Sequence, residues 1–216
     1  YNINGLKKKI TEIRIPAIPK DINLWIYSKK LPLLRITNQE MKWKDKLSTK
    51  AFNKFCFSRG YIRHSLSNLL HIDPLDVPID AKPGKAPILK LKNKFISISH
   101  SKEDMLFACA SNQIGIDIER EDRYFEALKI SKKFYSNFEN IELSKINSKN
   151  FNREVLKYWV IKEAAFKWER FNKNSNIFQW EWRKKSNIAI NPKRNLSVKT
   201  FLFKFEKYFC AIAYNS

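Results

Sequence analysis

Hydrophobic residues recur along this chain at two spacings, one typical of strands and one typical of helices. Residues 95–99 alternate apolar and polar side chains, and an apolar run at 105–110 follows a short polar gap, which together predict a β-hairpin around residues 101–104. Residues 46–70 carry apolar side chains close to helical spacing with basic residues between them, which predicts a helix. The same patterns predict strands at 22–27 and 113–119, helical segments at 125–143 and 154–171, and three or four strands from residue 177, the clearest at 196–205 and 208–214.

The order of these elements predicts the fold class. A strand, a helix and further strands are followed by a second strand, helices and strands, which indicates an α/β (α+β) fold in two halves. The halves meet near Ser111, giving an N-terminal half at 1–111 and a C-terminal half at 112–216. No flexible or low-complexity segment separates them, so we expect the halves to pack tightly together.

Composition excludes several classes of protein. A hydrophobic content of 44% argues against a disordered chain. No apolar run reaches the roughly 18–20 residues of a membrane-spanning helix, and residues 1–9 lack the apolar stretch of a secretory signal. Cys56, Cys109 and Cys210 are far apart in sequence, which is typical of reduced packing residues. We therefore expect a cytoplasmic protein without a membrane partner.

The net charge of +21 has two explanations that composition alone does not separate. A surface this basic attracts polyanions such as nucleic acids, acidic proteins or phosphate-bearing cofactors. Abundant lysine, asparagine and isoleucine beside only four glycines is also what AT-rich codon usage produces. The charge supports an anionic partner without choosing one.

Four acidic and basic side chains form the candidate chemistry of the C-terminal half. In a strand, Asp117 and Glu119 share one face, where two carboxylates repel each other unless solvent or a cation separates them. Glu163 and Lys167 lie four residues apart in a strongly helical stretch and project from one face. A magnesium ion with oxygen ligands is the natural partner of such acids. A solvated strand face and a surface Glu–Lys pair are the simpler alternatives.

Ser99 and His100 end the predicted strand at 95–99 within the sequence Ile-Ser-His-Ser. A hydroxyl, an imidazole and free backbone N–H groups at a strand end can all bind phosphate oxygens. A single histidine is more often structural or solvated than functional, so the motif is suggestive only in combination with others.

Three motifs together resemble the 4′-phosphopantetheinyl transferases. They are Ile-Ser-His-Ser (98–101), Gly-Ile-Asp-Ile-Glu (115–119), and Trp-x-x-Lys-Glu-Ala (159–164) with Lys167 beyond, in the family's order and spacing. The length is similar to the monomeric, surfactin-synthetase-activating class, which has two pseudo-symmetric halves with the active site at their interface. It is unlike the shorter, trimeric class.

The resemblance implies a function and residue roles. The enzyme would transfer the phosphopantetheine arm of coenzyme A to a serine of an apo acyl or peptidyl carrier protein and release 3′,5′-ADP. Mg²⁺, with Mn²⁺ as an alternative ion, would be held by Asp117, Glu119 and Glu163. Arg59 and His100 would contact the 3′-phosphate, Lys85 would line the nucleotide pocket and Ser99 would position phosphates. Lys167 would bind the transferring phosphate or protonate the leaving group, and Glu163, or else Asp117, would take the serine proton.

The resemblance has departures and one rival from another class. The family's Gly-Lys-Pro reads Gly84-Lys85-Ala86-Pro87, and the glycine turn expected within 169–176 is missing. Lys133-Phe134-Tyr135 resembles the family's Arg-Phe-Phe in the region where an acidic carrier docks. The rival is a nucleic-acid-binding module that uses aromatic stacking platforms. Since Phe55, Trp159 and Phe166 occupy apolar-periodic positions and no nucleic-acid motif is present, we expect no nucleic-acid partner.

Overall fold

The computed structural model describes residues 2–3, 11–80, 82–102, 104–169 and 175–215. Most of residues 1–9 and of the glycine-free loop at 169–176 therefore lies outside the described residues. The helices are α1 (Asn38–Met41), α2 (Thr49–Leu70), α3 (Ala127–Phe134), α4 (Asn137–Ser144) and α5 (Ser148–Trp168), with 3₁₀ turns at Lys44–Lys46, Ile177–Gln179, Lys184–Ser186 and Pro192–Arg194. The strands are β1 (Asn2–Ile3), β2 (Thr11–Ile13), β3 (Asn23–Ser28), β4 (Ile79–Asp80), β5 (Ile88–Leu89), β6 (Phe95–His100), β7 (Asp104–Ala110), β8 (Ile114–Arg120), β9 (Glu181–Arg183), β10 (Ile188–Asn191), β11 (Leu196–Phe205) and β12 (Tyr208–Tyr214).

Two sheets with the same core topology organise the chain. In the first, the order is β2-β3-β7-β6, and in the second it is β8-β12-β11-β10-β9, with β1 paired beside part of β11. The segment β3–α2–β6–β7 has the strand order β3-β7-β6, all antiparallel. The segment β8–α5–β11–β12 repeats this arrangement as β8-β12-β11, again antiparallel. The fold class predicted from the sequence, a mixed α/β (α+β) fold, is confirmed.

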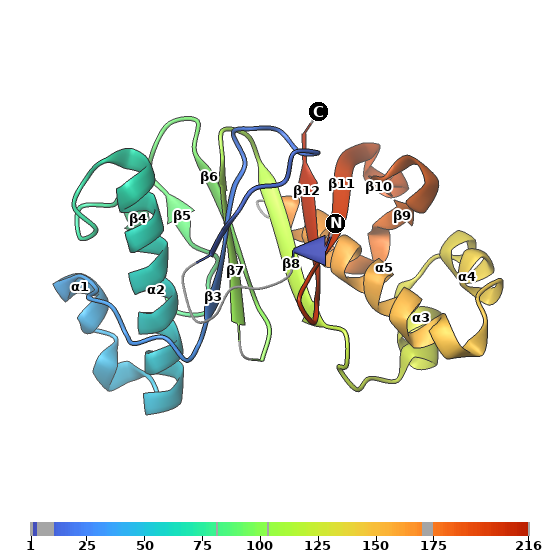
Figure 1. Ribbon diagram of the computed structural model, residues 1–216, viewed down its shortest axis with the longest axis horizontal. Coiled ribbons are helices and arrows are strands. Elements are labelled where there is room, and N and C mark those ends of the chain that lie inside the picture. The colour runs from blue at the N-terminus through green and yellow to red at the C-terminus, as the bar shows by residue number, and fades with distance from the viewer. Residues whose placement is uncertain (1, 4–10, 81, 103, 170–174, 216) are drawn as a thin grey trace.

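Alternation along the strands explains how the layers pack. In β7, one set of alternate side chains joins the hydrophobic cluster shared with the second sheet, and the other set joins the cluster beneath α2. In β12, one set likewise joins the shared cluster while the other packs with α5. The two sheets therefore lie face to face, with α2 outside the first and α5 outside the second (Figure 1). None of the described helices is long and apolar enough to cross a membrane.

Several boundaries differ from the sequence prediction for local reasons. The strand predicted as the opening one is the third, because the short strands β1 and β2 precede it. The helix predicted at 46–70 begins at Thr49, since the Ser48 side chain accepts a hydrogen bond from the Ala51 N–H and caps it. The helix predicted at 154–171 begins earlier, at Ser148, because Asn147 caps its start in the same way. It ends at Trp168.

Gly115 in β8 permits the close approach of α5. A Cβ atom at this position would lie 2.0 Å from the Ala164 carbonyl oxygen and 2.3 Å from the Trp168 nitrogen, both backbone atoms of α5. Since Gly115 shares its face of β8 with Asp117 and Glu119, the missing side chain brings α5 against the acidic residues.

Gly115→Ala is therefore expected to destabilise the protein by about 3 kcal/mol, in the upper range of overpacked sites, because backbone must move to admit one methyl group. Gly84→Ala is the matched control: Gly84 has a φ of 79°, but no atom lies within 4 Å of its added Cβ. The control should cost only about 1 kcal/mol of backbone strain. Urea unfolding followed by circular dichroism measures both, and equal losses would contradict this account of Gly115.

Candidate active site

The candidate site lies where the edge strands of the two sheets meet. Ser97 and Ser99 of β6 face β8: the Ser97 hydroxyl accepts a hydrogen bond from the Ile116 N–H at 3.2 Å. The Ser99 hydroxyl donates to Asp117 Oδ1 at 2.6 Å. Ile116 and Ile118 fill the core between the sheets, so Asp117 and Glu119 necessarily point the other way. Asp117 is only 4% exposed, which excludes the solvated strand face that the sequence left open.

Helix α5 adds its charged residues to the same place. The Lys167 ammonium lies 2.7 Å from Asp117 Oδ1 and 2.9 Å from the Ser99 hydroxyl. Lys167 is therefore not simply half of a surface pair with Glu163, which was the simpler alternative for this helix. Ser99, Asp117 and Lys167, three residues predicted from separate motifs, form one hydrogen-bonded group that joins β6, β8 and α5.

The carboxylates of this site repel one another. Burial and the Asp117 carboxylate raise the pKa of Glu119 to about 7, against the opposing effects of Arg123 and Lys167. Burial and Asp117 likewise raise the pKa of Glu163 to about 7, against Lys167 and Arg123. Such shifts mean that additional positive charge at this position would stabilise the ionised acids.

The donor set fits a hard divalent cation, although the side chains are not arranged around one. Asp117 Oδ2 is buried and has no hydrogen-bond partner among the described residues, so a strong acceptor is available. Three carboxylates supply the oxygen ligands that Mg²⁺ prefers. Within the described ranges, no group of three His, Cys, Asp or Glu side chains is close enough to hold a metal as it stands. Lys167 and Arg123 instead provide the positive charge beside Asp117 and Glu119.

A cavity of about 730 Å³ adjoins this group. Its walls come from α2, the 83–87 loop, β6 and α5. Four residues predicted from the sequence line it, namely Arg59, Lys85, His100 and Lys167. Apolar side chains, including Phe55, Ile62 and Phe166, form much of the remaining surface. The cavity thus combines several cations with apolar walls, which suits an anionic ligand with an aromatic group.

The departure at Gly84-Lys85-Ala86-Pro87 leaves Lys85 at the cavity. Gly84 adopts a left-handed conformation, and the Lys85 N–H donates to the Lys82 carbonyl at 3.0 Å, closing a turn. Lys85 is exposed at this turn and still lines the cavity. The insertion of one residue relative to the family's motif is therefore absorbed by the loop.

His100 is held neutral within a group of lysines. Its Nε2 lies 2.8 Å from the Ser58 hydroxyl. Burial, followed by the positive charges of Lys54, Lys29 and Lys167, lowers the pKa of His100 to about 3. No carboxylate of a described residue is among the groups that shift the pKa of His100, so the region around it carries positive charge and would attract an anion.

His100 predicts a pH dependence of stability. Its pKa is about 3 in the folded protein and about 6.5 when unfolded, so below pH 6.5 the unfolded chain binds a proton that the folded chain does not. The stability of the wild type relative to His100→Gln should therefore fall by about 1 kcal/mol per pH unit between pH 6 and 4. Glu119 and Glu163 contribute in the opposite direction, because their raised pKa values increase stability as pH falls from about 7. This contribution is present in both proteins and cancels when the stability of His100→Gln is subtracted from that of the wild type.

Urea unfolding of both proteins at several pH values measures this difference. A difference that does not vary with pH would show that His100 is protonated as readily in the folded protein as in the unfolded one, which would contradict its placement among the lysines.

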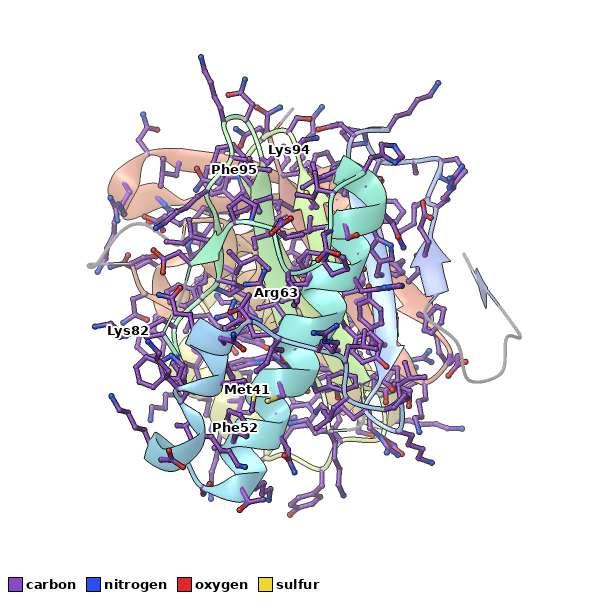
Figure 2. The ribbon with its side chains drawn as sticks, turned by 90° about the vertical axis from the view of Figure 1, so that its left-hand side faces the viewer. Met41, Phe52, Arg63, Lys82, Lys94 and Phe95 are labelled. Atoms are coloured by element: carbon purple, nitrogen blue, oxygen red, sulfur yellow. The ribbon has the colours of Figure 1, made fainter. Side chains whose placement is uncertain are left out.

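Several residues of the site were missed by the sequence reasoning. Lys54 and Ser58 line the cavity one helical turn apart on α2, and Ser58 is also three and four residues from the cavity residues Phe55 and Ile62; this helical spacing is a signal that could have identified them. Glu40 accepts two hydrogen bonds of 3.0 Å from the buried Arg63, at the middle of α2 in Figure 2. Its capping box with Thr37 was a recognisable motif.

Lys162 is a second omission, inside the motif that carries Glu163. Its side chain is fully buried, and its ammonium donates to Glu139 Oε2 at 2.7 Å and to the Trp180 carbonyl. Glu139 Oε1 in turn accepts from the Trp182 N–H at 2.8 Å. This pair connects α5 to α4 and β9, so Lys162 has a structural role. Its neighbour Glu163 lies toward the site, where it interacts with Asp117 and Lys167.

The segment that resembles the family's Arg-Phe-Phe is largely structural in this protein. Phe134 packs edge-on against Trp159 with ring centroids 5.4 Å apart. The Tyr135 hydroxyl donates to the Val155 carbonyl at 2.6 Å. Both aromatic residues therefore attach α3 to α5.

A smaller cavity of about 490 Å³ lies on the other side of His100. It is lined by His100, Ser101, Lys102, Glu119, Arg120, Asp122, Arg123 and Tyr124. Since His100 lines both cavities, the acidic residue Glu119 and the basic cavity wall belong to one continuous region.

Comparison with known proteins gives a match over the C-terminal part of the chain. Residues 113–213 match the model of the 4′-phosphopantetheinyl transferase superfamily. This segment contains Asp117 and Glu119 of β8 and Glu163 and Lys167 of α5. No curated protein matches the chain. The matched segment is thus similar to this superfamily, while Arg59, Lys85, Ser99 and His100 lie before it.

Proposed function

We propose that this protein transfers the 4′-phosphopantetheine arm of coenzyme A to a serine of an apo acyl or peptidyl carrier protein and releases 3′,5′-ADP. One observation carries the proposal: Lys167 lines the basic cavity and also contacts Asp117 in the segment similar to the transferases. A nucleotide in the cavity would therefore have its phosphates beside the acidic residues.

Coenzyme A suits the cavity in charge and in size. Its phosphates would be offset by Arg59, Lys85 and Lys167, and by His100 once an anion favours its protonated form. Apolar walls such as Phe55 and Ile62 offer contacts for the adenine ring. A cavity of about 730 Å³ is within the usual range for cofactor sites of this size.

The reaction requires a base and an acid from this chain. The carrier serine Oγ forms a bond to the β-phosphorus of coenzyme A, and the bond from that phosphorus to the bridging oxygen breaks, leaving 3′,5′-ADP. We assign Glu163 as the base for the serine proton, because Asp117 Oδ1 is already engaged by Ser99 and Lys167. Lys167 binds the transferred phosphate or gives a proton to the leaving group.

Asp117, Glu119 and Glu163 are the residues that would hold Mg²⁺, with Mn²⁺ as an alternative. Bound there, the ion would neutralise charge on the pyrophosphate of coenzyme A. Ser99 positions Asp117 through its 2.6 Å hydrogen bond, and thereby the phosphates that approach it.

The class and the partner are also part of the proposal. The repeated β-α-β-β topology supports two pseudo-symmetric halves, 1–111 and 112–216, and thus the monomeric, surfactin-synthetase-activating class. The first half supplies the basic residues of the nucleotide site, and the second supplies the acids and α5. The net charge of +21 favours an acidic carrier protein as the second substrate.

Intact-mass spectrometry tests the proposed reaction directly. An apo acyl carrier protein incubated with this protein, coenzyme A and Mg²⁺ should gain about 340 Da, the size of a phosphopantetheine arm. The gain should require the carrier serine and be lost in a carrier with that serine replaced by alanine.

Two other outcomes would contradict the proposal. If the folded protein labels none of several unrelated carriers, the proposal of a general transferase activity is wrong. Salt-sensitive RNA binding without coenzyme A binding would instead favour the nucleic-acid module, because phosphate contacts then account for the basic surface.

A further inference from the structure

Two basic side chains form ion pairs with acidic residues of the site. Lys167 pairs with Asp117 at 2.7 Å, and this lysine already has a role in the proposed reaction. Arg123 pairs with Glu119 Oε1 and has no role so far. The position of Arg123 is therefore the feature of this site that the proposed chemistry leaves unexplained.

The backbone after β8 directs Arg123 back toward the acids. The Arg123 N–H donates to the Arg120 carbonyl at 3.1 Å, so the chain turns directly after the strand that carries Glu119. Arg123 also lowers the pKa of both Glu119 and Glu163, which places its charge near two of the three carboxylates. Its guanidinium occupies the wall of the smaller cavity beside Glu119.

A neighbouring arginine in the same cavity is oriented differently. Arg120 Nε donates to Asp122 Oδ1 at 2.7 Å, and its second nitrogen pairs with Asp122 Oδ2. Arg120 and Arg123 thus carry the same charge on one short segment, but Arg120 pairs with Asp122 whereas Arg123 pairs with Glu119 of the site. This difference makes Arg120 a matched control.

We infer that Arg123 competes with the divalent cation for Glu119, so that its ion pair must open when the ion binds. The inference rests on the metal site of the proposed function. It is supported by the buried Asp117 Oδ2, which has no partner among the described residues and points to a cationic ligand. A guanidinium and a divalent ion on the same carboxylate would repel each other strongly at such short range.

The consequence is that Arg123 sets the affinity of the site for the ion. With the guanidinium in place, the acids are partly neutralised and an ion gains less by binding. Without it, no guanidinium competes with the ion for Glu119. Opening of the pair would free the Arg123 side chain, while Glu121 still holds the backbone here through Arg153 and Lys204.

Mn²⁺ binding to the full chain, without coenzyme A, tests this inference. The electron paramagnetic resonance signal of free Mn²⁺ gives the dissociation constant independently of activity. Arg123→Gln should bind Mn²⁺ about 3- to 10-fold more tightly than the wild type, the range expected for loss of one partly exposed ion pair and its repulsion. Arg120→Gln, with the same change in net charge, should stay within about twofold of the wild type.

The remaining variants make the outcomes distinguishable. Arg123→Lys, which retains the positive charge, should bind close to the wild type, and Glu119→Gln should weaken binding. Unchanged or weaker Mn²⁺ binding by Arg123→Gln overturns the inference, as does equal tightening by Arg120→Gln. Carrier labelling in the presence of Mg²⁺ separately decides the transferase function, so an active enzyme with no effect of Arg123→Gln refutes the inference alone.

Discussion

Glu163→Gln is expected to lower the rate of carrier labelling by about 10²- to 10⁴-fold, the usual contribution of a general base, while the protein remains folded. Glutamine keeps the size of the side chain but cannot accept the serine proton or supply a negatively charged ligand. The variant should be at least as thermally stable as the wild type at neutral pH, because burial and Asp117 already disfavour the ionised form of Glu163.

Loss of activity with retained or increased stability would distinguish a functional acid from a structural one. Glu154→Gln is the matched control on the same helix: Glu154 pairs with Lys157 and Lys184, outside the residues that line either cavity. Its labelling rate should be unchanged. Labelling by Glu163→Gln within about threefold of the wild type would exclude Glu163 as the base and favour Asp117.

Glu139→Ala is expected to produce the largest loss of stability, about 3–5 kcal/mol, because it leaves the fully buried Lys162 ammonium without its carboxylate. Burial already lowers the pKa of Lys162, and Glu139 is the main group that opposes this shift. For a chain of this length the loss corresponds to a fall in Tm of about 6–20 °C. Differential scanning calorimetry measures it.

Two further variants test this interpretation. Glu142→Ala on the same helix removes an exposed partner of Lys145 and should change Tm little. Adding Lys162→Met to a Glu139→Gln variant removes the uncompensated charge, so this double variant should be more stable than Glu139→Ala. If Glu139→Ala unfolds at the same temperature as Glu142→Ala, the buried Lys162–Glu139 pair does not stabilise the packing of α5 against α4.

The spacing of apolar residues was sufficient to predict most of the elements and the fold class. The hairpin at β6–β7, the helical segment at 125–143 that the structure divides into α3 and α4, and the strands β11 and β12 follow from local periodicity, which depends only on neighbouring residues. The starts of α2 and α5 were less accurate because single capping side chains decide them. The strands β1 and β2 were missed because they are two and three residues long, too short for a period to appear.

The sequence by itself also identified the residue types of the site, since the three motifs name Ser99, Asp117, Glu163 and Lys167. Only the tertiary structure decided how they meet. Lys167 contacts Asp117 rather than acting as a simple surface partner of Glu163, because Gly115 lets α5 approach β8 closely.

The partners of Arg123 and Lys162 likewise depend on the tertiary structure. Lys162 pairs with Glu139, 23 residues away in sequence, and Arg123 reaches Glu119 through the turn after β8. The Lys162 pairing depends on burial and on the packing of distant elements, which no local spacing encodes, whereas the Arg123 pairing depends on the turn that reverses the chain after β8. The sequence therefore determined the elements and the chemical groups of the site, while packing determined which charges neutralise one another and which remain for a ligand.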